Sequence, residues 1–481
     1  MANVAGIFAV LVFATLLQCV SKAQTAFVSQ STFPADGEIR QMLAERVTAI
    51  AGREDGIGIV VGLVGPRAKR IISYGHSENG DPRPLTGDTI FEIGSVGKVF
   101  TALVLADAIQ RREVALADPA AKYLPADTHI PERNGHQITL VELATHTSGL
   151  PFMPDTTPIV NMGSAHYYGT RDLYNFLARY QLTSDPGTDW EYSNIDYWLL
   201  AQALATRADT DYDALLQRRI FSPLGLKSTT VRVSDKLRMR LATGHDAALK
   251  PAIPFYGLSI YSILGASAGG IYSTANDLLS FLSDVMGYEG SALAPAMAAM
   301  LETRRPMDGS EQALGWIVVG KGDRQFIFHD GGTWGYASAA AWDPKSRMGV
   351  VVLSNQQESV SDIARHLLRP ELPLEKPAIA KHKETSLAPT LLDGYVGSYA
   401  ADGVGVFNIR RENDFLTLQL PADWGLPNFR LHPETREEFF VAEMPIHVTF
   451  STDAKGQVAG ALIYPPRGQH GIQTRRVNVG K

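Results

Sequence analysis

The stretch Phe91-Glu-Ile-Gly-Ser-Val-Gly-Lys98, together with the apolar segment that follows it, decides how the rest of the chain is interpreted. Ser95 and Lys98 stand three residues apart, so a helix that starts at Ser95 would place both side chains on one face, one turn apart. A hydroxyl within reach of an amine suits a nucleophilic serine with a basic neighbour. Residues 99–109 are apolar on nearly all sides, which predicts a buried helix. We therefore expect the pair to lie at the start of a central helix.

The Ser-x-x-Lys pattern alone is weak evidence for catalysis. At ordinary residue frequencies, roughly two such matches would occur by chance in a chain of this length. The sequence contains this pattern once, at Ser95, where it precedes an apolar segment. The pair becomes a firm catalytic hypothesis only when further residues support it.

The composition is ordinary for a globular protein and restricts the partners. The chain has 481 residues, which fits two or three domains, with 45% apolar and 20% charged residues. The formal net charge of −6 provides no basic surface, so we expect no nucleic-acid partner. The sequence contains no metal-ligand cluster and no phosphate-binding loop, so we expect no metal and no other cofactor.

Residues 1–23 are interpreted as a secretory signal peptide. Residues 2–20 form a nearly uncharged apolar run, and Ser21 and Ala23 are the small residues that a signal peptidase recognises. An uncleaved membrane anchor is the alternative; a lipoprotein signal is disfavoured because Gln18 is too large to precede a lipidated Cys19. Cys19 is the only cysteine, so the mature chain would have no disulfide. We expect a periplasmic or secreted protein without membrane association after cleavage.

Strand-like runs lie at both ends of residues 36–370, and helical patterns fill the middle. The runs comprise residues 56–64, 70–75, 324–332, 336–342 and 348–354. Short turns between consecutive runs predict antiparallel pairing. We therefore predict an α+β fold, in which one antiparallel sheet of about five strands is flanked by helices and faces a helical lobe. A cleft between sheet and lobe is the natural place for a site.

Two segments of the middle region contain polar residues that suit a site. Tyr192, Ser193 and Asn194 stand in a loop just before a helix, where they could serve chemistry or simply cap that helix. His146 lies in the segment Thr145-His-Thr-Ser-Gly-Leu-Pro151. We interpret it as a structural histidine bonded to nearby backbone rather than as a catalytic one.

A linker and a second domain follow the first. Residues 371–389 are rich in proline and charge, which is typical of a linker. Short alternating runs such as residues 415–420 and 447–450 predict that residues 390–481 form a small all-β domain. The second domain contains no set of catalytic residues, so we expect the chemistry in residues 36–370.

Three motifs in a fixed order resemble a known family. Ser95-Val-Gly-Lys98, Tyr192-Ser-Asn194 and His329-Asp-Gly331 are similar to the motifs of the serine β-lactamases and penicillin-binding proteins, specifically the class C β-lactamase and DD-peptidase branch. The segment that contains His146 is similar to a segment of that branch as well. The resemblance covers the first domain, and the second resembles small β-barrel domains appended to some members.

The resemblance implies a role for each residue of the first two motifs. Ser95 would attack a carbonyl and become acylated, with Lys98 as the neighbouring base or proton shuttle. Tyr192 would activate Ser95 or protonate the leaving group, and Asn194 would hold Lys98 and the substrate amide. Burial lowers a lysine pKa and nearby cations lower a tyrosine pKa, so the sequence leaves open which of the two is the base.

The third motif would form the opposite wall of the site. His329 and Gly331 would lie on a strand there, and the N–H groups of Gly332 and Ser95 would form the oxyanion hole. β-Lactamases of this branch usually carry Lys-Thr-Gly at this point, whereas the His-x-Gly form resembles some secreted DD-peptidases and D-amino-acid peptidases. A permanent cation is thus replaced by one that titrates near pH ~6.5.

Three functions are therefore considered. The first is an exported serine hydrolase acylated at Ser95 by D-Ala-D-Ala-like peptides or β-lactams, so that the partner is a small-molecule or peptide acyl substrate. The second is a carboxylesterase that uses the same Ser/Lys/Tyr site. The third is a non-catalytic relative that binds cell-wall peptide or a partner protein. The sequence does not indicate an oligomeric state.

Overall fold

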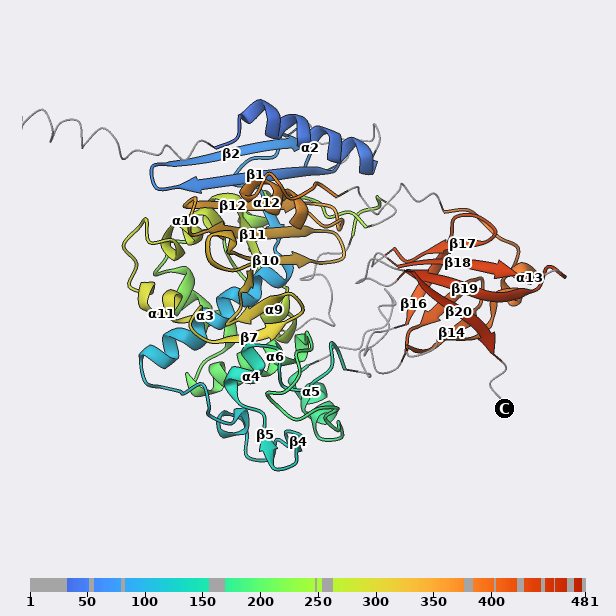
Figure 1. Ribbon diagram of the computed structural model, residues 1–481, viewed down its shortest axis with the longest axis horizontal. Coiled ribbons are helices and arrows are strands. Elements are labelled where there is room, and N and C mark those ends of the chain that lie inside the picture. The colour runs from blue at the N-terminus through green and yellow to red at the C-terminus, as the bar shows by residue number, and fades with distance from the viewer. Residues whose placement is uncertain are drawn as a thin grey trace, which may run out of the picture. The chain divides into compact units, whose positions relative to one another are not determined.

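A computed structural model of the chain is shown in Figure 1. It describes residues 33–51, 56–78, 83–154, 169–246, 249–252, 263–375, 384–401, 404–421, 428–442, 446–453, 455–464 and 471–477. The predicted signal peptide lies outside the described residues. Within these ranges, no helix combines the length and apolar character that a bilayer-spanning segment requires.

One antiparallel sheet of eight strands forms the centre of the first domain (Figure 1). The order across the sheet is β2-β1-β12-β11-β10-β9-β8-β7, and each neighbouring pair is antiparallel. The strands are β1 (Gly58–Gly65), β2 (Ala68–Gly75), β7 (Arg304–Met307), β8 (Ser310–Ala313), β9 (Ile317–Val319), β10 (Phe326–Gly332), β11 (Ala337–Asp343) and β12 (Met348–Ser354). Because β1 pairs with β12, strands from the two ends of the domain lie side by side in the sheet.

The predicted fold class is confirmed, but the expected strand number of about five was wrong. The five predicted runs correspond to β1, β2, β10, β11 and β12, and the missed strands are β7, β8 and β9. These have only four, four and three residues. The outermost, Arg304-Arg-Pro-Met307, has the charges and the proline of an edge strand, which discourage pairing with another chain. Such strands lack the apolar alternation by which longer strands are detected.

Helices cover both faces of the sheet, which explains why β1 is buried along its whole length. On one face, α2 (Asp36–Ala51) packs on β2, and α12 (Ser361–Leu368) packs on β11 and β12. A buried ion pair between Arg46 and Asp362 joins these two helices. On the other face, α10 (Ala275–Val285) packs on β1 and β12, so closely that a Cβ at Gly62 would lie 2.8 Å from Leu279.

The helical lobe is built around α3 (Gly97–Gln110), whose apolar residues are buried on all sides. The predicted helix start was slightly early, because Ser95 lies in a 3-10 turn, η1 (Gly94–Val96), that leads into α3. The remaining helices and turns are η2 (Ala120–Tyr123), α4 (Leu140–Ala144), α5 (Thr170–Leu177), α6 (Asn194–Arg207), α7 (Tyr212–Leu216), the π-turn η3 (Gln217–Phe221), α8 (Asp235–Arg238), α9 (Ile263–Ala268), α11 (Ala294–Ala299) and η5 (Gly322–Arg324). Two small ribbons pair β3 (Ile90–Glu92) with β6 (Tyr272–Thr274), and β4 (Glu132–Arg133) with β5 (His136–Gln137).

The C-terminal part is a closed eight-stranded antiparallel barrel, which confirms the predicted all-β character. Its interior is filled by a separate core that includes Tyr399, Phe407 and Phe450. After α13 (Pro389–Leu392) and η6 (Asp393–Tyr395), the strands are β13 (Gly397–Ala401), β14 (Gly405–Glu412), β15 (Phe415–Gln419), β16 (Phe429–Pro433), β17 (Glu438–Phe440), β18 (His447–Thr452), β19 (Val458–Tyr464) and β20 (Ile472–Val477).

Candidate active site

Ser95 lies in the turn η1, which packs against the end of β10. Gly94 adopts a left-handed backbone with φ +49°, and a Cβ there would lie 2.6 Å from the Gly332 nitrogen. Only glycine allows this conformation and this approach without strain. The Ser95 Oγ lies 3.0 Å from the Lys98 Nζ and 2.7 Å from the Tyr192 hydroxyl. The two predicted neighbours of Ser95 therefore both contact it.

Lys98 is fully buried, and its amine has three polar contacts. The Nζ lies 2.8 Å from the Asn194 Oδ1, 2.7 Å from the Ala268 carbonyl oxygen and 3.0 Å from the Ser95 Oγ. An amide oxygen and a carbonyl oxygen can only accept, so two N–H bonds of Lys98 are directed to them. The third position on nitrogen faces Ser95. An ammonium would donate a hydrogen there, whereas a neutral amine would offer its lone pair to the serine proton.

Tyr192 and Asn194 are placed by the N-terminus of α6. The Ser193 Oγ accepts the Asp196 N–H at 3.2 Å and thereby caps the helix. The sequence had suggested helix capping as one possible role for the residues of this loop. Asn194 is the first residue of α6, and its Oδ1 accepts from Lys98 while its Nδ2 lies 3.6 Å from the Met153 Sδ. The same loop therefore provides a helix cap and the two predicted site residues.

Strand β10 presents its third-motif residues to opposite faces, because side chains alternate along a strand. His329 is paired with Ala340, which belongs to the core shared with the lobe, and His329 is only 2% exposed. Asp330 faces the other side, where its Oδ2 accepts from the Ser361 Oγ of α12 at 2.7 Å. His329 and Gly331 thus lie on the Ser95 side of the sheet, as expected.

Gly331 and Gly332 differ in the space around them. A Cβ at Gly331 would lie 2.2 Å from the Ile93 carbonyl oxygen and 2.7 Å from the Ser95 nitrogen. A Cβ at Gly332 would meet nothing within 4 Å. The backbone of β10 therefore approaches the Ser95 turn through Gly331, which brings the two proposed oxyanion donors, Ser95 N–H and Gly332 N–H, onto adjacent segments.

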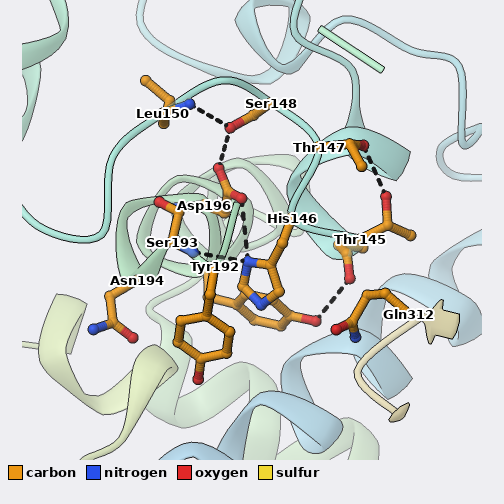
Figure 2. A network of polar contacts seen from close by, with 12 residues as sticks. Thr145, His146, Thr147, Ser148, Leu150, Tyr192, Ser193, Asn194, Asp196 and Gln312 are labelled. Carbon is orange, nitrogen blue, oxygen red and sulfur yellow. Dashed lines mark hydrogen bonds and ion pairs between the residues drawn. The ribbon is translucent and has the colours of Figure 1, made fainter. Parts of the chain in front are cut away.

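Behind Tyr192 lies a buried polar network that sequence reasoning identified only in part (Figure 2). The His146 Nδ1 accepts the Ser193 backbone N–H at 3.2 Å, which confirms the predicted backbone contact. The same nitrogen lies 3.3 Å from the Asp196 Oδ2, and this partner was not predicted. Asp196 stands at the third position after a capping serine, where an acidic residue is common in any helix, so its sequence position gave no specific signal.

The arrangement has the chemistry of acyl transfer to a serine. A hydroxyl that contacts both a buried amine and a phenol can lose its proton as it attacks a carbonyl. The described residues contain no group of three or more histidine, cysteine, aspartate or glutamate side chains arranged for a metal ion. The fold and this set of residues are those of a serine hydrolase of the β-lactamase and DD-carboxypeptidase type.

Comparison with known proteins agrees with that class. The model of the Beta-lactamase family matches residues 39–371, and the chain belongs to this family. A second model, a domain of unknown function named DUF3471, matches residues 381–476.

The chain is similar to D-alanyl-D-alanine-carboxypeptidase/endopeptidase AmpH of Escherichia coli, with 28% identity over 324 residues that cover 61% of this chain and 80% of the relative. It is also similar to a beta-lactamase of Pseudomonas fluorescens, with 26% identity over 66% of this chain and 94% of that protein. Among solved structures, a class C beta lactamase from Rhodobacter sphaeroides has a TM-score of 0.58 and 26% identity, and covers 70% of this chain and 97% of its own.

Proposed function

We propose that the protein is an exported serine hydrolase that is acylated at Ser95 by D-Ala-D-Ala-like peptides or β-lactams. The observation that carries the proposal is the simultaneous contact of the Ser95 Oγ with the Lys98 Nζ at 3.0 Å and with the Tyr192 hydroxyl at 2.7 Å. Two of the similar proteins are a D-alanyl-D-alanine-carboxypeptidase/endopeptidase and a beta-lactamase, which supports these two substrate classes.

In the proposed reaction, the Ser95 Oγ attacks the acyl carbon, and its proton passes to Lys98 or Tyr192. The negative charge that develops on the substrate oxygen is stabilised by the N–H groups of Ser95 and Gly332. The C–N bond then breaks, and the leaving nitrogen takes a proton through Tyr192, whose hydroxyl is in contact with Ser95. Water hydrolyses the resulting ester and restores Ser95.

The test of this proposal is a three-substrate panel with covalent detection. Nitrocefin, a D-Ala-D-Ala peptide and p-nitrophenyl butyrate are each incubated with the mature protein, and intact mass spectrometry records any adduct. We expect an adduct or turnover with the first two substrates, and its loss in Ser95→Ala. A protein that neither forms an adduct with nor turns over any of the three substrates would instead be the non-catalytic relative.

One observation favours the carboxylesterase as a second candidate. The His329 Nδ1 lies 2.7 Å from the Asp330 carbonyl oxygen. A carbonyl oxygen only accepts, so the Nδ1 must carry the hydrogen, and the single N–H of a neutral imidazole is already used. A neutral His329 therefore has no N–H left to offer to a substrate carboxylate. Only the imidazolium would offer Nε2–H to such a substrate, whereas a neutral ester needs no cation.

A pH titration separates acidic from neutral substrates. We expect KM for a carboxylate-bearing peptide or β-lactam to rise as pH increases through the range of imidazole titration, about pH 5 to 8, because the imidazolium that binds the carboxylate is lost. KM for p-nitrophenyl butyrate should stay flat over this range. His329→Lys should remove the pH dependence for the acidic substrate. Parallel KM profiles for both substrates would contradict a carboxylate-binding role for His329.

The close approach at Gly331 predicts a large effect of a single methyl group. Gly331→Ala should push β10 away from the Ser95 turn, because the new Cβ would overlap the Ile93 carbonyl oxygen. A displacement of about 1 Å at a catalytic centre can cost about a hundredfold in rate, so we expect kcat/KM to fall by about that factor. Gly332→Ala is the matched control, since its Cβ has open space and its N–H is kept. Equal losses in the two variants, measured with p-nitrophenyl butyrate, would contradict the argument.

A further inference from the structure

We propose that His146 is a positioning residue for Tyr192, and that a neutral Asp196 holds it in this role by donating a hydrogen to the His146 Nδ1. The inference rests on the proposed function, in which Tyr192 transfers a proton to and from the substrate. Figure 2 shows the side chains involved, which come from the loop after α4 and from the start of α6.

The first step concerns the packing of Tyr192. Its ring lies against the His146 ring, with 4.4 Å between centroids and 32° between planes. The Phe152 ring is stacked on Tyr192 at 6.1 Å, and Trp190 lies at 6.5 Å. His146 thus makes the closest of these three ring contacts. A small rotation of the phenol would move its hydroxyl away from the Ser95 Oγ, which lies only 2.7 Å from it.

The second step assigns the hydrogen between His146 and Asp196. The Ser193 backbone N–H donates to the His146 Nδ1 at 3.2 Å, and an amide N–H can only donate. The Nδ1 is therefore an acceptor and carries no hydrogen. The Asp196 Oδ2 lies 3.3 Å from that nitrogen, and two acceptors do not bond to each other. A hydrogen bond between them therefore needs a hydrogen on Asp196, so that the Ser193 N–H and the Asp196 O–H share the single lone pair of the Nδ1 and Asp196 is a carboxylic acid.

The other oxygen of Asp196 agrees with this assignment. The Ser148 Oγ accepts the Leu150 N–H at 3.0 Å and donates its own hydrogen to the Asp196 Oδ1 at 2.5 Å. Oδ1 is thus the accepting carbonyl oxygen of the acid, and Oδ2 is the oxygen that carries the hydrogen. Both oxygens have a partner of the required kind.

The electrostatic surroundings also favour a neutral acid. Burial, which is complete for this side chain, raises the pKa of Asp196 well above its ordinary value, and the charges of Glu191 and Glu142 raise it further. The hydrogen bond from Ser148 and the charge of Lys98 act in the opposite direction, but they do not outweigh burial.

Two tyrosines, Tyr192 and Tyr197, also lie next to His146. Burial raises the pKa of Tyr197 well above its ordinary value, so that phenol stays neutral. The pair of His146 and Asp196 next to Tyr192 is uncharged in this assignment, and the Lys98 Nζ lies 4.9 Å from the Tyr192 ring centroid. A neutral pair at this position orients the phenol without competing with Lys98 for its proton.

The backbone conformation of His146 supports a functional role for this residue. Its φ of +57° lies in the left-handed region, which costs free energy for a residue with a side chain. The conformation is held because the His146 carbonyl oxygen accepts the Glu191 N–H at 2.8 Å. Strained residues of this kind concentrate at functional sites.

The chain allows a variant that removes only the ring. In His146→Asn, the Asn Oδ1 takes the place of the Nδ1 acceptor, and asparagine tolerates a left-handed backbone. We expect a folded protein with KM within about twofold of wild type and an acylation rate about tenfold lower, since orientation and not binding is lost. His136→Asn in the exposed strand β5 is the control and should change nothing. Wild-type acylation in a folded His146→Asn protein would overturn the positioning role.

Two variants of Asp196 test its charge. In Asp196→Asn, the amide N–H₂ can donate to Nδ1 and the amide oxygen can accept from Ser148, so we expect wild-type activity and an unchanged pH profile. Asp196→Leu leaves both partners buried and unbonded, and should lower acylation and the melting temperature. If Asp196→Asn is as damaging as Asp196→Leu, the carboxylate is ionised and the inference is wrong.

A spectroscopic readout makes the inference independent of catalysis. ¹⁵N NMR of the histidines in wild type and His146→Asn assigns the His146 signal, and we expect a neutral ring with its hydrogen on Nε2 from about pH 5 to 8. A hydrogen on Nδ1, or an imidazolium, would overturn the assignment. The NMR result does not depend on the proposed function. If Ser95→Ala retained turnover, the proposed function would be refuted, but the measured tautomer of His146 would still stand.

Discussion

Ser95→Ala is expected to abolish adduct formation and to lower turnover of every substrate by a factor on the order of 10⁴ or more, because no other hydroxyl takes the place of a deleted nucleophile. The protein should remain folded. The Ser95 side chain is partly exposed, and Lys98 keeps its two other acceptors, Asn194 and the Ala268 carbonyl.

The measurement combines kcat/KM, intact mass after incubation with a β-lactam, and the melting temperature. Ser73→Ala is a suitable control, since it deletes a serine hydroxyl of the sheet that donates to the Leu85 carbonyl oxygen. Substantial turnover by a folded Ser95→Ala protein, with the control unchanged, would remove Ser95 from the mechanism.

Lys98→Met and Tyr192→Phe are each expected to lower the acylation rate at least about a hundredfold, the range of general acid–base groups. Methionine fills the space of the fully buried lysine stem without an amine, and phenylalanine keeps the ring that packs against His146. Both polar groups contact the same oxygen, the Ser95 Oγ, so they act on one proton.

The double variant should therefore be little worse than the slower single variant, because groups that act as a unit are not additive. Single-turnover kinetics with p-nitrophenyl butyrate measure this coupling directly, and melting temperatures show whether Lys98→Met is still folded. Losses that simply multiply in the double variant would mean that Lys98 and Tyr192 act independently.

Ser95 and Lys98 could be identified as candidate site residues from the sequence because the evidence for them is local. Ser95 and Lys98 are one turn apart in any helical arrangement, so their contact follows from their spacing. The apolar run after them predicts a buried helix, and α3 is buried on all sides. The contact of Tyr192 with Ser95 was expected only from the order of the motifs, since 97 residues separate the two positions.

The features that could not be predicted are three short strands and a main-chain contact, for which the sequence contains no clear pattern. Strands β7, β8 and β9 are too short to show an alternating pattern, and they extend the sheet by pairing one after another beyond β10. The Ala268 carbonyl oxygen accepts a hydrogen bond from Lys98. Every residue type has a main-chain carbonyl, so the sequence does not indicate which residue provides this acceptor.

The sequence by itself determined the fold class and the buried helix at the centre, because these follow from periodicity, and its resemblance to a known family indicated which polar groups would meet there. The tertiary structure alone decided the state of those groups. Whether His329 has an N–H to offer depends on the carbonyl of Asp330, and whether Asp196 is charged depends on Ser148, on Ser193 and on complete burial. Protonation depends on the donors, acceptors and solvent around a side chain, and distant segments provide these only when the chain is folded.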